Sequence, residues 1–308
     1  MRGLGFFQLH GPFEELGNVG FCFVILHVLR LLVGFAATSG RHFAHDKDRK
    51  KLASYAWYSC YYCVILAWGA WLFYVDKQWG QDMTRVCEWE SIQSSMGNAS
   101  SLHVYHCVQV AFYLNYLFAM VTGIDVKRKD QLAFAAHHVI TVLLILFSRN
   151  WGYMRIQLAT LVLHDAADPF LSLAKMIKAA CPTWTWLPDL LMTSFALVFY
   201  ATRWVLYPLY LVANCREDWR TLYPLDWTRV QDSYTFAASD KGICIGGVFF
   251  SYYGLAMLLL YALYVLHVYW GLFILFMAHR KFTGTGSGAS STGDDNSDDE
   301  AVEKQKTQ

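Results

Sequence analysis

Residues 135–175 read AAHHVITVLLILFSRNWGYMRIQLATLVLHDAADPFLSLAK. Two apolar runs flank a short polar turn, a pattern that predicts two helices joined by a tight connection. His137 and His138 lie about 13 residues before this turn, and His164 and Asp165 lie about 14 residues after it. Because an α-helix rises about 1.5 Å per residue, the two groups return to nearly the same depth. We therefore expect these side chains to face each other.

The composition of the whole chain places this stretch in a membrane. Of 308 residues, 56% are hydrophobic and 16% are charged, whereas about a quarter are charged in a soluble domain. A membrane crossing needs about 20 residues of apolar helix. The predicted fold class is an all-α polytopic membrane helical bundle of about seven transmembrane helices. The candidate spans are Gly20–Ala37, Tyr55–Val75, Val104–Ile124, Leu132–Phe147, Trp151–Leu173, Leu190–Ala213 and Ile243–Ala278, the last read as one tilted or protruding helix.

The distribution of basic residues predicts how the bundle is oriented. With seven spans, the main Lys and Arg clusters near residues 41–51, 127–129, 175–178 and 280–281 all fall on one side. The positive-inside rule makes that side cytosolic, with a lumenal N-terminus and a cytosolic C-terminus. The loop from 212 to 241 weakens the argument because it carries basic residues on the other side. The net charge of +1 gives no reason to expect nucleic acid.

We divide the chain into three parts by composition. We expect residues 1–18 to form a lumenal N-terminal segment, residues 19–282 to form the transmembrane domain, which also holds any catalytic site, and residues 283–308 to form a disordered acidic cytosolic tail. The first apolar segment is expected to be a retained helix and not a cleaved signal. Whether the sequon at Asn98 is glycosylated, or Ser297 in the acidic tail is phosphorylated, is left open.

The polar residues of the quoted stretch require either a shared cavity or partners in the bundle. Asp168 follows His164 by one helical turn on the same face, whereas Asp165 is rotated by about 100°. Pro169 removes a backbone donor and is expected to loosen the helix there. A single histidine near a helix end is usually an interfacial or hydrogen-bonded residue. Five ionisable groups at one depth are expensive to bury in hydrocarbon unless they face each other or water.

Taken together, these residues resemble a known sequence motif. The His137-His138 pair, Phe147-Ser148, Arg155 and His164-Asp165-x-x-Asp168 are similar to the Lag1 motif of ceramide synthases, within the broader group of TRAM, Lag1 and CLN8 membrane proteins. The similarity covers roughly residues 48–282. Gln157 stands where the family commonly has glycine, and Ser172 stands where animal members often have glutamate. No homeobox-like segment is present between the first two helices.

The resemblance implies an acyltransferase that joins a fatty acyl group from acyl-CoA to the amine of a sphingoid base. In this interpretation His137 forms an acyl-imidazole, and Asp165 or Asp168 holds a histidine tautomer and accepts the amine proton. His138 and His164 orient the pair or polarise the thioester carbonyl. The implied location is the endoplasmic reticulum membrane. No metal and no permanently bound cofactor is expected, with acyl-CoA acting as co-substrate.

The expected partners are fatty acyl-CoA, a sphingoid base and membrane lipids. Lys127, Arg128 and Lys129 either attract the CoA phosphates or serve only as a topology anchor. Trp204 and Tyr207 either line a cavity for the lipid tails or pack ordinarily. Acyl chain length, the preferred base and oligomeric state are not determined by the sequence, and a homodimer or heterodimer is compatible with it.

Three other functions are weighed against this one. A lipid-binding or translocon-associated protein of the same fold would keep the helices and lack the chemistry. A metal-dependent hydroxylase or desaturase needs more histidine boxes than the sequence offers. A transporter is also compatible, because ionisable groups inside a membrane mark proton paths as well.

Overall fold

The computed structural model describes residues 12–75, 99–125, 130–150, 154–212, 237–238, 242–245 and 248–283. The helices are α1 (Pro12–Thr38), α2 (Asp46–Val75), α3 (Ala99–Thr122), α4 (Gln131–Asn150), α5 (Met154–Asp165), α6 (Asp168–Ala180), α7 (Trp186–Phe199), the π-helix η3 (Tyr200–Val212) and α9 (Tyr252–Phe282). Three short strands complete the described part: β1 (Ala237–Ala238), β2 (Gly242–Ile245) and β3 (Val248–Ser251).

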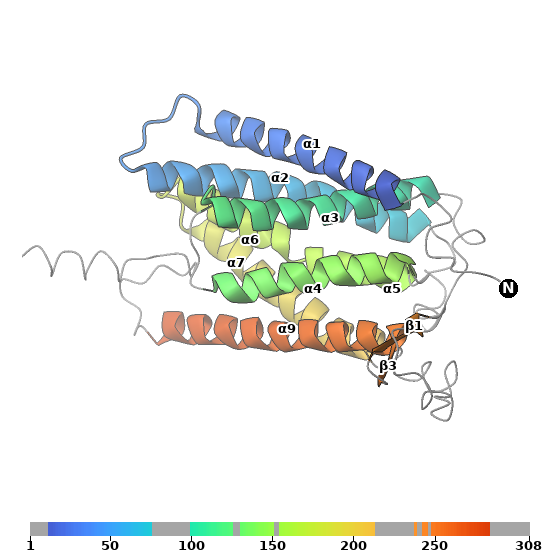
Figure 1. The fold of residues 1–308 in the computed structure, drawn as a ribbon. Helices are drawn as coiled ribbons and strands as arrows, with labels where there is room; N and C mark the ends of the chain where they lie inside the picture. Colours follow the sequence, from blue (N-terminus) through green and yellow to red (C-terminus); the bar gives the residue numbers. More distant parts are fainter. Residues whose placement is uncertain are drawn as a thin grey trace, which may run out of the picture.

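The helices run back and forth along one bundle axis, which confirms the predicted all-α polytopic membrane fold (Figure 1). In the described residues, six helical segments are long and apolar enough to cross a membrane. The predicted span Trp151–Leu173 corresponds to two shorter helices, α5 and α6, that together return the chain along the bundle. Many of the exposed side chains on the outer helices are large and apolar, as expected for a surface that faces lipid tails. The protein is therefore a multi-pass membrane protein.

The last predicted span is wrong at its N-terminal end. Instead of one long helix from Ile243, residues 242–251 form β2 and β3, which pair antiparallel, and α9 begins only at Tyr252. β1 adds a third antiparallel strand beside β2. The two longer strands are rich in Val, Ile and Phe and flank the dipeptide Gly246-Gly247 in the sequence, which is a hairpin signal. Because these strands are as apolar as the helix that follows, apolar content alone predicts one continuous helix here.

A break in the helix separates α5 from α6 at Ala166 and Ala167. Pro169 stands in the first turn of α6, and because proline has no N–H it leaves a carbonyl of the preceding turn without its helical donor. The predicted loosening of the backbone is thus a complete interruption. It allows the end of α5 and the start of α6 to present side chains toward the same interior space.

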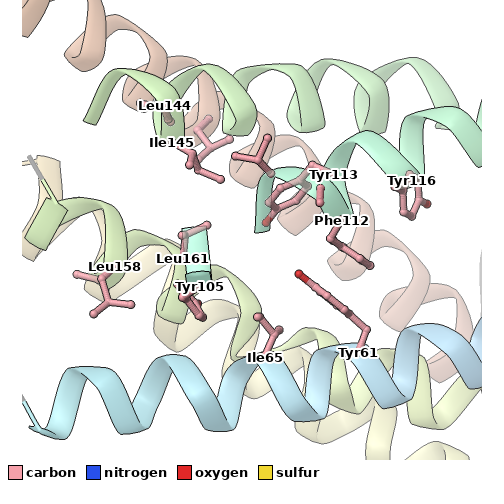
Figure 2. Close-up of a cluster of buried hydrophobic side chains, with 14 of the residues drawn as sticks. Tyr61, Ile65, Tyr105, Phe112, Tyr113, Tyr116, Leu144, Ile145, Leu158 and Leu161 are labelled. Carbon is pink, nitrogen blue, oxygen red and sulfur yellow. The ribbon is translucent and has the colours of Figure 1, made fainter. Parts of the chain in front are cut away.

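The packed centre of the bundle is an aromatic cluster between α2, α3, α4 and α5 (Figure 2). Tyr61 stacks on Phe112 with ring centroids 3.5 Å apart and planes 4° from parallel. Ile145 of α4 and Leu158 of α5 extend the cluster and are both fully buried. This contact layer fixes α4 and α5 against α2 and α3, and so sets the position of the polar residues at the ends of α4 and α5.

Candidate active site

A cavity of about 230 Å³ opens inside the bundle next to this core. Helices α2, α3, α4, α6, α7 and α9, the end of α5 and the π-helix η3 all contribute side chains to its wall. The wall contains the five ionisable residues expected from the sequence: His137, His138, His164, Asp165 and Asp168. The structure therefore brings together residues from α4, α5 and α6 that are up to 31 positions apart in the sequence.

The three histidines form a compact aromatic group. The rings of His137 and His164 lie 6.0 Å apart, centroid to centroid, and are inclined by only 23°. The ring of His138 lies 5.4 Å from that of His137 at a steep angle. Trp270 of α9 closes the group with its ring 5.4 Å from His137. The predicted meeting of the two helices at one depth is thus present in the structure.

Hydrogen bonds to the backbone distinguish His138 and His164 from His137. Nδ1 of His138 lies 2.7 Å from the carbonyl oxygen of Phe134, and Nδ1 of His164 lies 2.7 Å from that of Thr160. A carbonyl oxygen can only accept, so in both rings Nδ1 carries the proton. Nδ1 of His137 is buried and has no hydrogen-bond partner among the described residues. His137 is therefore the one imidazole of the three whose Nδ1 is not fixed by a backbone carbonyl.

Asp165 is held by a buried chain of polar side chains that the sequence analysis did not identify. Nε2 of Gln109 donates to Oδ2 of Asp165 at 2.8 Å and also to the hydroxyl of Tyr105 at 3.0 Å. The hydroxyl of Tyr61 donates to Oε1 of the same glutamine at 3.1 Å. Because a buried carboxylate is costly without hydrogen bonds, this network fixes one carboxylate oxygen of Asp165.

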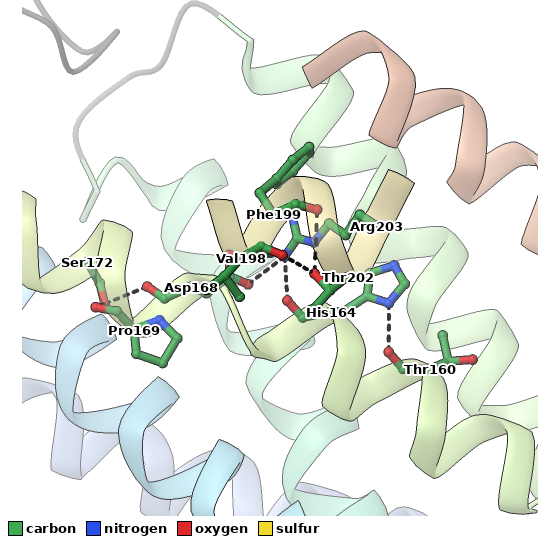
Figure 3. A network of polar contacts seen from close by, with 9 residues as sticks. All are labelled: Thr160, His164, Asp168, Pro169, Ser172, Val198, Phe199, Thr202 and Arg203. Atoms are coloured by element: carbon green, nitrogen blue, oxygen red, sulfur yellow. Dashed lines mark hydrogen bonds and ion pairs between the residues drawn. The ribbon is translucent and has the colours of Figure 1, made fainter. Parts of the chain in front are cut away.

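Asp168 is held by Arg203 of η3 (Figure 3). Nη2 of Arg203 lies 3.1 Å from Oδ1 and 3.2 Å from Oδ2 of Asp168, and it also donates to the backbone carbonyl of His164. This carbonyl belongs to the last turn of α5, just before the helix break. Arg203 therefore joins the two sides of the break and ties them to η3. Wide π-helical turns are often found at functional positions.

One end of the cavity carries basic side chains. Lys51, near the start of α2, and Lys175, in the middle of α6, both line it. Nζ of Lys175 lies 5.5 Å from the ring centroid of Tyr55 although the residue is only 6% exposed. Two acidic residues, Asp125 and Asp130, line the same cavity. In the sequence, Lys51 and Lys175 indicate only the orientation of the bundle, and nothing there connects them with the site.

The walls of the cavity differ in polarity. On α2 and α3 the wall consists mostly of hydroxyl-bearing side chains, namely Ser54, Tyr55, Tyr58, Tyr62, Tyr113 and Tyr116. On α6, α7 and α9 it is largely apolar and consists of Leu171, Met192, Phe195, Phe199, Phe273, Ile274 and Met277. A cavity with one hydroxyl-bearing wall and one apolar wall suits an amphipathic molecule with a polar end and a hydrocarbon tail.

Some expectations are revised or fall outside the described residues. Trp204 and Tyr207 do not line the cavity: the indole Nε1 of Trp204 donates to the backbone carbonyl of His267, and the hydroxyl of Tyr207 donates to that of Leu260. Lys127, Arg128 and Lys129, the sequon at Asn98 and the acidic tail lie outside the described residues. In the parts of the chain that are described, no three His, Cys, Asp or Glu side chains are grouped so that they could hold a metal ion.

Sequence comparisons agree with this architecture. The model of the TLC domain (TRAM, LAG1, CLN8) matches residues 51–275. The chain is 31% identical to human ceramide synthase 3 over 231 residues, which is 75% of this chain and 52% of that protein. It is 31% identical to bovine ceramide synthase 4 over 231 residues, 75% of this chain and 50% of that one.

A plant protein is related as well. Alternaria stem canker resistance protein 1 of Solanum lycopersicum is 34% identical over 176 residues, which is 57% of this chain and 50% of that protein. The chain thus spans about half the length of the curated relatives it matches. The matched region runs from α2 into α9 and contains the five ionisable residues of the cavity. The chain belongs to the TLC domain family.

Proposed function

We propose that this protein is a ceramide synthase, which transfers a fatty acyl group from acyl-CoA to the amine of a sphingoid base. The observation that carries the proposal is the state of His137. It lines the cavity beside two other imidazoles and two carboxylates, and its Nδ1 has no partner in the described residues. A nucleophile must be able to use its lone pair and to lose its proton, so a ring that is not fixed by the backbone suits this role.

The first chemical step is acylation of His137. A ring nitrogen lone pair attacks the thioester carbonyl carbon, the carbon–sulfur bond breaks, and CoA leaves as a thiolate. The acyl-imidazolium then loses its remaining N–H proton, which neutralises the thiolate by way of a nearby carboxylate. Thr160 and Phe134 fix the tautomer of His164 and His138 through Nδ1, whereas Nδ1 of His137 is not held by a backbone carbonyl. His137 is therefore the proposed nucleophile.

The second step transfers the acyl group to the base. The amine attacks in its uncharged form, the bond between the acyl carbon and His137 breaks, and an amide forms. Asp165 or Asp168 accepts the proton that the amine releases and returns it to the imidazole, which restores neutral His137. Gln109 and Arg203 are positioning residues here, because each holds one of these carboxylates without being the acceptor.

The polarity of the cavity supports the choice of substrates. Hydrocarbon tails are stable against the apolar wall of α6, α7 and α9, whereas the hydroxyls of a sphingoid base find partners among the tyrosines of α2 and α3. We assign the end with Lys51 and Lys175 to the cytosol, where these lysines attract CoA phosphates together with Lys127, Arg128 and Lys129. This places the N-terminus in the lumen of the endoplasmic reticulum and the C-terminus in the cytosol.

The proposal is tested with purified protein, a panel of acyl-CoAs and sphinganine, with amide products measured by mass spectrometry. Before the base is added, peptide mapping is expected to find an acyl group on His137. His137→Ala is expected to give neither the adduct nor the amide. His279→Ala is the matched control, because His279 lies exposed near the end of α9 and does not line the cavity.

Two results would contradict the proposal in different ways. If His137→Ala makes amide at the normal rate, the acyl-imidazole is excluded while the activity stands. If the wild-type protein makes no amide with any acyl-CoA but binds sphingoid bases or acyl-CoA, the family member is a non-enzymatic lipid-binding protein.

A further inference from the structure

Arg30 is a buried cation on a helix with a largely lipid-facing surface. It belongs to α1, which packs along α2 and α3 (Figure 1), and it is only 4% exposed. Large apolar side chains of the same helix, such as Leu31, Leu32 and Phe35, are more than half exposed. A charged side chain inside a membrane is costly unless it is paired, and it marks a candidate functional position. Because α1 precedes the matched family region at residues 51–275, Arg30 comes from outside that domain.

The partner of Arg30 is the carboxylate of Asp125. Nη2 of Arg30 pairs with Oδ1 of Asp125, and the hydroxyl of Ser54 donates to the same oxygen at 2.6 Å. The hydroxyl of Tyr58 donates to Oδ2. The guanidinium carbon of Arg30 also lies 5.5 Å from the centroid of the Tyr58 ring. Side chains of both α1 and α2 therefore hold this carboxylate.

The backbone at the end of α3 sets the position of Asp125. Gly123 has a φ of +71°, a left-handed conformation that glycine adopts without strain. The backbone N–H groups of Ile124 and Asp125 both donate to the carbonyl of Ala119, at 3.0 and 3.3 Å. This pattern caps the helix and turns the chain so that the Asp125 side chain meets Arg30. The basic residues 127–129 follow directly in the sequence.

Asp125 lines the cavity, whereas Arg30 lies behind the cavity wall. The wall also carries Lys51, Lys175 and Asp130. The formal charges of these two lysines and the two aspartates cancel. Arg30 adds one positive charge next to Asp125, and the sum for these five side chains becomes +1. The residue that makes this group of charges positive is therefore one that the cavity does not contact.

We propose that Arg30 is a positioning residue for acyl-CoA: it pairs with Asp125 from outside the cavity wall, neutralises that carboxylate and keeps the entrance attractive to the CoA phosphates. This inference rests on the proposed ceramide synthase function. Without Arg30, the carboxylate of Asp125 would repel the phosphates and oppose the attraction of Lys51. The interaction acts on the phosphates and not on the reacting atoms, so its loss changes KM and leaves kcat unchanged.

Substitutions of Arg30 and Asp125 separate the charge from the hydrogen bond. Arg30→Gln keeps an N–H donor and loses the charge, so the KM for acyl-CoA is expected to rise about 3- to 10-fold at unchanged kcat. Arg30→Lys keeps the charge, and its KM is expected to stay within about twofold of the wild type. The double variant Arg30→Gln with Asp125→Asn restores the charge balance and is expected to restore KM. Asp125→Asn alone leaves an additional positive charge and is expected to lower KM. Arg49→Gln is the matched control, because Arg49 pairs with Asp46 at the exposed start of α2.

An acyl donor without phosphates separates this role from a general effect on folding. With the same acyl group carried by N-acetylcysteamine, an uncharged thioester, Arg30→Gln is expected to show the KM of the wild type. Equilibrium dialysis with acyl-CoA gives a measurement independent of turnover, in which the Kd of Arg30→Gln is expected to rise as KM does. A raised Kd in Arg30→Gln, together with no amide synthesis by the wild type, would reject the proposed function and keep the role of Arg30 in acyl-CoA binding.

Four results would overturn the role of Arg30. They are an unchanged KM for acyl-CoA in Arg30→Gln, an equal rise of KM with the uncharged thioester, a double variant that stays impaired, and a KM in Asp125→Asn that is not lower than in the wild type. The last result decides the question even if Arg30→Gln does not fold, because Asp125→Asn leaves Arg30 in place.

Discussion

The contact between Arg203 and Asp168 gives the sharpest test of how the site is built. Arg203→Met keeps the length and apolar character of the side chain and removes the guanidinium. The pair is largely buried, with side-chain exposures of 8% for the arginine and 21% for the aspartate. Removing one partner of a buried ion pair costs about 3–5 kcal/mol. Because Asp168 is partly exposed and reaches the cavity, we expect about 3 kcal/mol, at the low end of that range.

A double variant identifies the origin of this loss. In the double variant Arg203→Met with Asp168→Asn, no carboxylate is left without its arginine. We therefore expect it to be about 1–2 kcal/mol more stable than Arg203→Met alone. The remainder reflects the carbonyl of His164, which still lacks the donor that Arg203 supplied across the helix break. The stability of Arg203→Lys is expected to lie between that of the wild type and that of Arg203→Met, because a lysine ammonium keeps the charge but does not match the fork geometry of the guanidinium.

Thermal unfolding in detergent, followed by intrinsic tryptophan fluorescence, measures these differences. At about 2–4 °C per kcal/mol for chains of similar size, Arg203→Met is expected to lower the midpoint by about 6–12 °C. Asp46→Asn at the start of α2 is the control, because its ion pairs with Arg49 and Lys50 are exposed and exposed pairs contribute little. A fall in the unfolding midpoint of less than about 2 °C in Arg203→Met, or a double variant that is less stable than Arg203→Met, would refute the stabilising role of Arg203.

Two further predictions concern packing and the cavity mouth. Gly271→Ala places a Cβ 2.4–2.5 Å from three atoms of the indole ring of Trp204, so we expect a loss of about 1–3 kcal/mol in the free energy of unfolding. Gly20→Ala, where no atom lies within 4 Å, is the control and should lose nothing. Lys51→Glu is expected to raise the KM for acyl-CoA severalfold without changing kcat, measured by initial rates, because it reverses a charge at the cavity. Lys50→Glu is the control and should leave KM unchanged, because Lys50 pairs with Asp46 outside the cavity. Equal effects of the two substitutions would reject a specific role for Lys51.

The sequence predicted the helical framework because membrane crossing leaves a strong compositional signal. It also predicted that His137 and His164 lie at one depth, since two helices of similar length on either side of a short turn must return to the same level. It failed at Ile243–Ser251, where a hairpin is as apolar as a helix. Average hydrophobicity does not separate the two, although the dipeptide Gly246-Gly247 in the sequence is a hairpin signal.

The supporting residues of the site were not predictable in the same way. Gln109, Arg203 and His267 lie on α3, η3 and α9, and each contacts the end of α5 from a distant part of the sequence. A lone polar residue in an apolar helix signals that a partner exists. It does not identify the partner, because that depends on how helices pack.

The helix break between α5 and α6 explains why the site and the fold depend on the same residues. An unbroken helix would point Asp165 about 100° away from His164 and Asp168, so the three could not all reach one cavity easily. The interruption before Pro169 removes this restriction but leaves a carbonyl of α5 without a donor inside the membrane, where water does not replace it. Arg203 supplies that donor and pairs with Asp168 at once. The group that stabilises the broken helix is therefore the same group that orients a proposed catalytic carboxylate, and a variant that weakens one must weaken the other.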